Sequence, residues 1–286
     1  MIPNRRAVLA LGAALPLLAS GVRAAEPAAA NIDAGLAWRR LFAGADGQTF
    51  AWWFQGMMFA HVDGLREFPV VGHHAVMVCR ATTGEDGGQL DFRVAGCFSD
   101  IDSGAPTDHW DNPFTGQRQA IPPCFVEGPG RYVVTGHGEA LTTTLASAAT
   151  RTNRFVVTAA GSGQGVMLTQ IEGTLQGFPR LDGTLPPLGD PAITERQTRI
   201  QIVAPLGVPT ADAASVPVGG GPVRGLYNHV YDALPPWLGF GERLGSGLSK
   251  GVMRRAAADE AVNPLVWAYL RQRLPSAFKG GRLVLA

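Results

Sequence analysis

Lysine is nearly absent from this 286-residue chain, because Lys250 and Lys279 are the only two and every other basic residue is arginine. The 24 basic residues are balanced by 23 acidic ones, and no basic patch stands out that would hold phosphates. Nucleic-acid binding depends on such a surface. We therefore do not expect nucleic acid as a partner.

Cysteine is also scarce, with Cys79, Cys97 and Cys124 and neither a CxxC nor a CxxCH pattern. Iron–sulfur, c-type haem and zinc-ribbon sites are therefore unsupported, and we expect no cofactor. An odd number of cysteines leaves at least one outside any intramolecular disulfide. The sequence does not decide whether Cys79 and Cys97 form a disulfide, since they lie on predicted strands joined by a turn and could approach each other.

The motifs of several enzyme folds are missing too. The GSGQG segment at 161–165 is a glycine-rich turn and not a GxSxG nucleophile elbow, because no helix pattern follows it. Strands and helices do not alternate along the chain, which argues against Rossmann and TIM-barrel folds. No repeat of roughly 20–50 residues indicates a solenoid or a propeller.

One long apolar run occurs, and it lies at the beginning of the chain. Residues 7–19 are uncharged and follow Arg5 and Arg6, a layout that predicts a cleaved secretory signal at 1–24. The paired arginines resemble the twin-arginine export motif, with an ordinary Sec signal as the alternative. We expect a periplasmic protein whose mature part, residues 25–286, is a single β-rich domain without stable membrane insertion. Cleavage would remove three basic residues and change the net charge from +1 to −2.

Short β-branched and aromatic runs, separated by glycine-rich turns, fill the chain after Thr49. In residues 90–98 the apolar Leu90, Phe92, Val94 and Phe98 alternate with Asp91, Arg93 and Cys97, which is the period of a strand. About eight such runs with flanking helices predict a mainly β fold, an antiparallel barrel of the lipocalin or calycin type. A β-sandwich is the alternative. A closed sheet can enclose a lumen that holds one small ligand.

Other segments interrupt the predicted strands. Residues 31–43 and 263–275 are expected to be helical, the second with Asn263 as its N-cap and Pro264 in its first turn. Residues 100–130 are expected to form a long irregular excursion, of a kind that often carries function. A short helical turn is expected at the beginning of 224–240.

Three tryptophan-containing segments occur in a characteristic order: Trp52-Trp53-Phe54-x-Gly56, Trp110-x-Asn112-Pro113-x-Thr115-Gly116, and Pro236-Trp237-Leu238 followed by Gly241. In these segments the chain resembles the bacterial domain-of-unknown-function family 1838, over most of its mature length. The segments LSKGVMRRAAADEAVNP and PPCFVEGPG depart from the family pattern. The resemblance implies a shared fold, often with an export signal, and no known reaction.

The densest polar and aromatic cluster is the segment TDHWDNPFTG at 107–116. Asp108 and His109 offer a carboxylate and an imidazole for acid–base chemistry, and Trp110 and Asn112 are candidate ligand contacts. The alternative is a structural turn, because Asp and Asn hydrogen-bond their own backbone and Asn-Pro favours turns.

Histidines and charged residues on the predicted strands supply further candidates. His73 and His74 must point to opposite faces of their strand, so at most one enters the barrel. A zinc site from His74, His109 and His137 has no supporting local spacing, and we expect no metal.

Two further groups of strand residues leave their roles open. Asp91 and Arg93 share one face, either as a charged pair in the cavity or as solvated charges; the apolar opposite face favours the second. Trp52, Trp53 and Phe54 either line an apolar pocket or belong to a strand that is buried on both sides.

Two functional hypotheses follow, from different classes. The first is a periplasmic, cofactor-independent lyase, isomerase or hydrolase that acts on a small apolar or aromatic molecule in the barrel cavity. Its catalytic residues would be His109, Asp108, His74 and Arg93. The second is a non-catalytic carrier of a small apolar ligand. The expected ligand contacts are Trp52, Trp53, Phe54, Asp91, Trp110, Asn112 and His137. A structural or envelope-associated protein is a third possibility.

Overall fold

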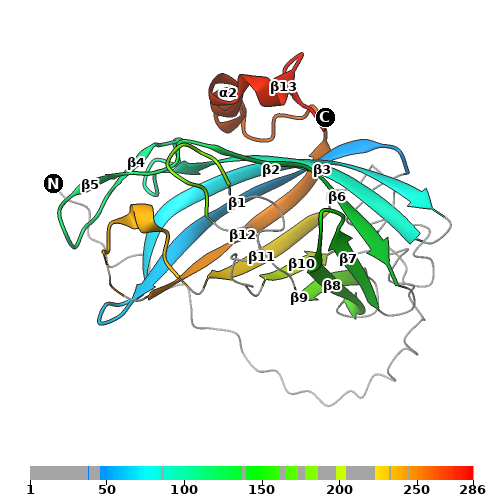
Figure 1. Cartoon of the computed structure of the whole chain (residues 1–286), viewed down its shortest axis with the longest axis horizontal. Helices are drawn as coiled ribbons and strands as arrows, with labels where there is room; N and C mark the ends of the chain where they lie inside the picture. The colour runs from blue at the N-terminus through cyan, green and yellow to red at the C-terminus, as the bar shows by residue number, and fades with distance from the viewer. Residues whose placement is uncertain are drawn as a thin grey trace, which may run out of the picture.

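Ten antiparallel strands close into a barrel in the computed structural model of the chain (Figure 1), in the order β1-β12-β11-β10-β9-β8-β7-β6-β3-β2. The structure describes Trp38 and residues 46–84, 87–136, 140–160, 165–172, 178–185, 198–203, 223–231, 233–241, 243 and 245–285. The barrel strands are β1 Thr49–Val62, β2 Phe68–Gly84, β3 Gly87–Ser99, β6 Phe125–Thr135, β7 Ala140–Leu145, β8 Ala148–Ala160, β9 Gly165–Glu172, β10 Thr198–Val203, β11 Arg224–Tyr231 and β12 Gly245–Ala257. The predicted antiparallel barrel is therefore confirmed, with ten strands in place of about eight.

Alternation along β3 shows how the sequence builds the wall. Leu90 and Phe92 are buried in the interior, whereas the residues that alternate with them, Asp91 and Arg93, lie on the outer face. Directly opposite residues of paired strands share a face. The register from β3 through β2 and β1 to β12 therefore assigns each residue of these strands to the interior or to the outer face.

Two sequence-based assignments are wrong in the region after residue 220. Residues 224–231 form the strand β11 and not a helical turn; the one turn of helix comes later, as η4 Pro236–Leu238. Residues 245–257, which carried no predicted element, form β12 between β11 and β1.

The expected irregular excursion at 100–130 contains a short hairpin of β4 His109–Asp111 and β5 Arg118–Ala120. The helix predicted at 31–43 lies outside the described residues except for Trp38, which is helical and buried. The predicted signal segment also lies outside them. No helix in the described part of the chain is both long and apolar enough to cross a membrane.

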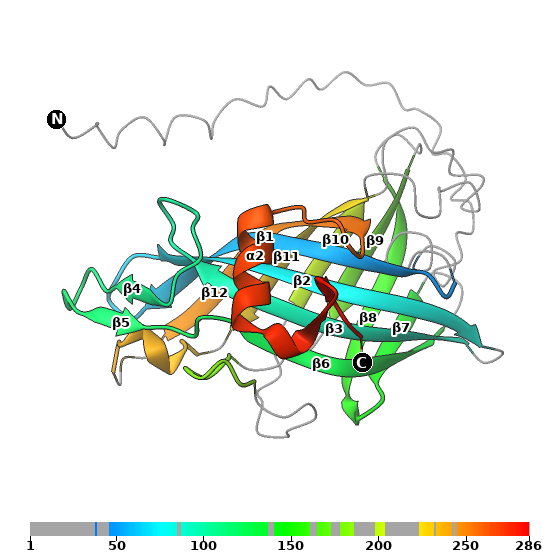
Figure 2. The ribbon, with the colours of Figure 1, turned by 90° about the horizontal axis from the view of Figure 1, so that it is seen from above.

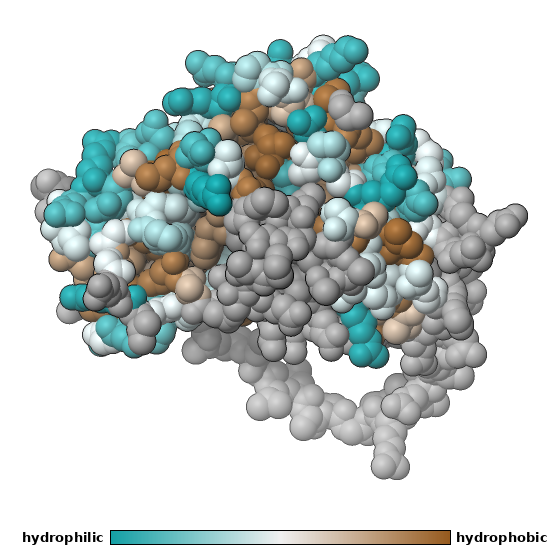
Figure 3. Space-filling view, viewed as in Figure 1, coloured by the Kyte–Doolittle hydropathy of each residue, from teal (hydrophilic) through white to brown (hydrophobic). Residues whose placement is uncertain are grey.

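The helix α2 Pro264–Arg273 lies across the outer face of β1, β2 and β3 (Figure 2). Its predicted cap is confirmed, because the Asn263 side chain accepts a hydrogen bond from the Val266 backbone N–H at 3.3 Å. Val266 and Leu270 are buried against the barrel, and apolar side chains gather beneath the helix (Figure 3). The chain continues through η5 Pro275–Ala277 into the short hairpin β13 Phe278–Lys279 and β14 Arg282–Leu283.

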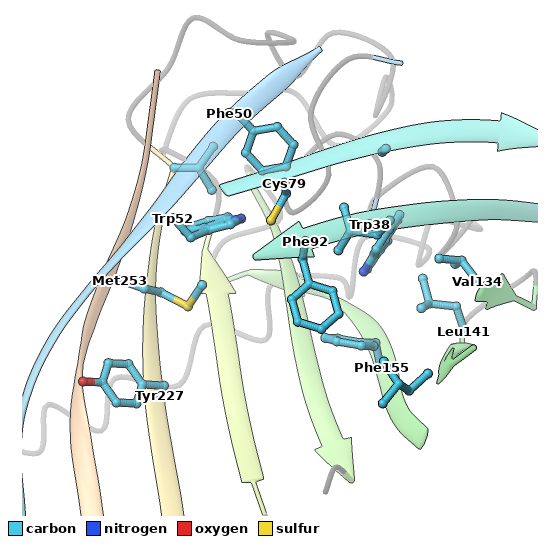
Figure 4. Packing of buried hydrophobic residues seen from close by; sticks show 14 residues of the cluster. Trp38, Phe50, Trp52, Cys79, Phe92, Val134, Leu141, Phe155, Tyr227 and Met253 are labelled. Atoms are coloured by element: carbon cyan, nitrogen blue, oxygen red, sulfur yellow. The ribbon is translucent and has the colours of Figure 1, made fainter. Parts of the chain in front are cut away.

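Apolar side chains close the barrel interior at two levels. At one level Trp38, Trp52, Phe92 and Phe155 pack together (Figure 4). At the other level interior residues of β1 to β3 pack against the β4–β5 hairpin and η4. The polar residues described below lie where the two clusters meet, and Tyr227 belongs to the first of them.

The cysteines are placed so that the Cys79–Cys97 disulfide is excluded. Cys79 faces the interior cluster of Trp52 and Phe92, whereas Cys97 lies on the outer face beneath α2. All three cysteines are free and buried. Burial raises the pKa of the Cys97 thiol to about 12, so this thiol stays protonated near neutral pH.

Candidate ligand-binding site in the barrel interior

A row of four interior positions crosses the barrel wall from β2 to β11. In this row His73 lies opposite Gly56, Gly56 opposite Gly251, and Gly251 opposite Tyr227. The two glycines leave space between the histidine and the tyrosine. A Cβ atom added to Gly56 would lie 2.3 Å from Tyr227 Oη, and one added to Gly251 would lie 2.6 Å from it.

Because Gly56 and Gly251 carry no side chain, the Tyr227 side chain of β11 extends over β12 and β1 and reaches His73 on β2. Its hydroxyl group forms a hydrogen bond with His73 Nε2. The two ring centroids are 5.5 Å apart, with the planes inclined at 67°. Phe54, from the next interior position of β1, packs edge-on against Tyr227 at 5.7 Å. The sequence segment Trp52-Trp53-Phe54-x-Gly56 thus supplies both the wall and the gap that this tyrosine needs.

The next row toward η4 contains His229 and Ser249, which are directly opposite each other on β11 and β12. Opposed residues in an antiparallel pair have Cβ atoms roughly 4.5–5.5 Å apart. The His229 ring lies 5.1 Å from the Tyr227 ring. Neither His229 nor Ser249 forms a side-chain hydrogen bond with another described residue. Both side chains therefore keep their hydrogen-bonding capacity for something else.

Burial keeps this cluster electrically neutral at physiological pH. It lowers the pKa of His73 to about 3, with smaller contributions from the neighbouring imidazoles of His229 and His74, and the pKa of His229 to about 4. It also raises the pKa of the Tyr227 phenol above its ordinary value. The site therefore presents neutral hydrogen-bonding groups and no charge.

Several interior side chains at this level remain partly exposed although they point away from the outer face. They include His73, His229 and Phe54. Close-packed interiors leave little accessible surface on core side chains. The partial exposure therefore indicates that side chains do not completely fill the middle of the barrel.

Aromatic rings continue from this level toward the end of the barrel that bears η4. His229 is followed by Tyr231 at 6.4 Å, and Tyr231 packs on Phe178 at 4.4 Å. Phe178 in turn lies 6.4 Å from Trp237, whose indole N–H donates to the Pro179 carbonyl at 3.1 Å. The wall between the polar cluster and this end is thus largely aromatic.

The candidate ligand contacts Trp110 and Asn112 hold this end of the barrel together. The Asn112 amide donates to the Leu238 carbonyl at 3.1 Å, and its oxygen accepts from the backbone N–H groups of Phe114 and Thr115 at 2.9 and 3.2 Å. Trp110 is buried in the same cluster as Leu238. Asn112 therefore has the structural turn role that was the alternative for residues 107–116. Its hydrogen bond to Leu238 also connects this segment to η4.

The two leading catalytic candidates lie on the β4–β5 hairpin, outside the polar cluster. The side chains of His109 and Asp108 are 39% and 52% exposed, with His109 Nδ1 3.1 Å from the Asp108 carboxylate. The hydrogen bond to His109 lowers the pKa of Asp108. Arg273 of α2 approaches the same carboxylate at 3.6 Å, and Arg118 contacts the His109 ring. These residues form a charged group at the surface.

Four other candidates face outward, so they do not contact a ligand in the cavity; for Asp91 and Arg93 this is the alternative that the apolar opposite face favoured. Trp53 packs on Trp267 of α2 with ring centroids 5.4 Å apart, because β1 is covered on both faces. Asp91 pairs with Arg131 at 2.5 Å and with Arg80 at 3.5 Å.

The remaining two outward-facing candidates are Arg93, which donates to the Val284 carbonyl at 3.3 Å, and His74, which is buried on the outer side of β2. His137 lies outside the described residues. Trp52 and Phe54 do face the interior. Of the four catalytic candidates, His109 and Asp108 contact each other at the surface, and none of the four enters the barrel interior.

The interior residues Tyr227, His229 and Ser249 were missed by the sequence-based reasoning. The segment YNHVY at 227–231 places Tyr227, His229 and Tyr231 at alternate positions, a pattern that identifies one face of a strand. Within the described residues, no group of three or more potential ligands is placed to bind a metal.

No family model and no curated protein matches the chain. Among solved structures, the chain is similar to a crystal structure from Nitrosomonas europaea of a protein provisionally described as AttH, at 11% identity and a TM-score of 0.21. The match covers 77% of this chain and 55% of that protein, so the chain spans about half of its length. A likeness of this size carries no functional argument.

Proposed function

We propose that this protein binds a small, largely apolar molecule inside the barrel, beside His73, Tyr227, His229 and Ser249. The observation that supports the proposal is the group of partly exposed interior side chains around His229, which combines aromatic walls with hydrogen-bonding groups that have no partner among the described residues. Ligand pockets typically combine apolar walls with a few oriented polar groups.

Binding without chemistry fits the polar cluster better than catalysis does. A serine opposite a histidine is also the arrangement of a nucleophile and its base. However, no hydrogen bond joins Ser249 to His229, and a general base works best with a pKa near the operating pH. The pKa of about 4 for His229 lies well below that range. The carrier therefore becomes the leading proposal, and the cofactor-independent enzyme remains its competitor.

We also propose, from the sequence patterns alone, that the protein is periplasmic and is related to family 1838. If residues 1–24 are a cleaved export signal, the ligand is taken up in the periplasm. Gly56 and Asn112 belong to the segments through which the chain resembles family 1838, so we expect the same roles in its members: Gly56 makes room for an interior tyrosine, and Asn112 holds the end of the barrel.

The proposal is tested by titrating the protein with N-phenyl-1-naphthylamine, an uncharged apolar dye that fluoresces in apolar surroundings. We expect saturable binding with one site per chain. Phe54→Trp adds bulk to a partly exposed interior position beside Tyr227 and should weaken binding at least tenfold. The matched control is Val252→Trp, at an outer-face position that is 53% exposed, which should leave the affinity within twofold.

Non-saturable fluorescence, or equal losses in the two folded variants, would contradict the proposal. Turnover of a bound ester or other small substrate that disappears in Ser249→Ala would instead favour the enzyme.

A further inference from the structure

We infer that the ligand carries an uncharged hydroxyl group on an aromatic ring system, and that His229 and Ser249 bind this hydroxyl group. The inference rests on the proposed function and identifies the chemical class of the ligand. The structure assigns the two side chains to adjacent interior positions of β11 and β12.

The first argument is the unused hydrogen-bonding capacity of the pair. Other polar side chains of the interior pair with each other: Tyr227 with His73 Nε2, Asn153 with Thr143, and Gln170 with Asn153, although His73 Nδ1 is buried without a partner among the described residues. His229 and Ser249 differ, because neither makes a side-chain hydrogen bond within the described part of the chain. Polar groups placed deep in a protein are normally hydrogen-bonded. A ligand hydroxyl group can donate to one of the two side chains and accept from the other.

The second argument is the charge of the surroundings. The imidazoles of His73 and His229 are neutral near pH 7, because burial lowers the pKa of each. The interior Arg255 is six residues from Ser249 along β12, roughly 20 Å at the rise of a strand. A carboxylate at His229 would therefore lose its hydration without meeting a cation, which is unfavourable.

The third argument is the aromatic character of the walls. The His229 ring stands at 87° to Tyr231, and Phe54 stands at 72° to Tyr227. A ligand ring beside these side chains can add stacked or edge-to-face contacts, which stabilise aromatic pairs beyond the apolar area that they bury.

The experiment compares three ligands of equal ring size, by displacement of N-phenyl-1-naphthylamine: naphthalene, 2-naphthol and 2-naphthoate. For the wild-type protein we expect 2-naphthol to bind about tenfold more tightly than naphthalene, as one net hydrogen bond to a buried partner predicts. We expect 2-naphthoate to bind no more tightly than naphthalene.

Two variants and a control assign the preference to the named residues. His229→Leu should reduce the ratio between 2-naphthol and naphthalene to about one, and Ser249→Ala should reduce it in part. Asn228→Leu is the control, because Asn228 is the preceding residue of β11 and is exposed on the outer face, so the ratio should not change. Imidazole ¹⁵N resonances of the wild-type protein supply a measurement without mutation: those of His229 should shift with 2-naphthol and not with naphthalene.

The outcomes separate the two levels of the argument. If the dye and all three ligands fail to bind, the proposed function is wrong. If the dye and naphthalene bind but 2-naphthol has no advantage, or if His229→Leu keeps that advantage, the proposed function stands and the hydroxyl inference is overturned. Tighter binding of 2-naphthoate would also overturn it.

Discussion

Because the imidazoles of His73 and His229 are buried, we expect the protein to lose stability as the pH falls below about 6.5, before its carboxylates begin to titrate. An unfolded chain protonates His73 and His229 near pH 6.5, whereas the folded protein does so only near pH 3 and pH 4. Below pH 6.5 the unfolded state therefore binds more protons than the native state, and the free energy of unfolding falls as the pH falls. The stabilisation is complete above pH 6.5 and is lost progressively toward pH 4.

The magnitude follows from these pKa values. Between pH 7 and pH 5 each imidazole lowers the free energy of unfolding by about 2 kcal/mol, which gives about 4 kcal/mol for the pair. Burial also lowers the pKa of His74, which acts in the same direction. The lowered pKa values of Asp91 and Asp108 act only below about pH 4, outside this interval.

The assay is urea unfolding at pH 7, 6 and 5, followed by tryptophan fluorescence and circular dichroism. In His229→Leu the decrease between pH 7 and pH 5 should shrink by about 2 kcal/mol, because one titrating group is removed. His61→Gln is the control, since His61 is exposed on β1, and the decrease should stay as in the wild type. A wild-type decrease below about 1 kcal/mol, or an unchanged decrease in His229→Leu, would refute the reasoning.

Two further predictions concern packing. Gly251→Ala should lower the free energy of unfolding by about 2 kcal/mol or more, because its Cβ would lie 2.6 Å from Tyr227 Oη and 2.2 Å from a backbone oxygen. Gly88→Ala, whose Cβ would lie 3.4 Å from its nearest neighbour, should change it by less than about 1 kcal/mol; similar values for both would contradict the packing account. Asn112→Ala removes three side-chain hydrogen bonds and should lower the free energy of unfolding in urea by about 2–4 kcal/mol. Asp111→Ala, at an exposed neighbouring position, should lower it little. Equal effects of the two substitutions would show that the Asn112 hydrogen bonds do not stabilise the fold.

The strands at the beginning of the barrel were predictable because their apolar residues face the core. β3 alternates Leu90 and Phe92 with Asp91 and Arg93, and the pattern identifies both the strand and its buried face. The helix α2 was predictable for an equally local reason: Asn263 and Pro264 mark its first turn. Such features depend on neighbours in the sequence and need no tertiary information.

β11 and β12 escaped prediction because their pattern is reversed. Leu226 and Val252, which lie opposite each other, are 51% and 53% exposed on the outer face. The interior positions carry Tyr227, His229, Ser249 and several glycines, with Met253 as the only buried aliphatic side chain that the interior cluster takes from the described part of these two strands. A reader of the sequence who places apolar residues inside would therefore assign these strands to the wrong face, or see no strand at all.

The sequence by itself determined the class of fold, the α2 helix and the rule that His73 and His74 point in opposite directions. Only the closed barrel decided which of the two faces the interior, because that depends on which face of β2 is enclosed. Closure also brought His73 to Tyr227, which lies 154 residues later in the chain. Pairing between distant strands is set by the register of the whole sheet, and no local pattern contains it.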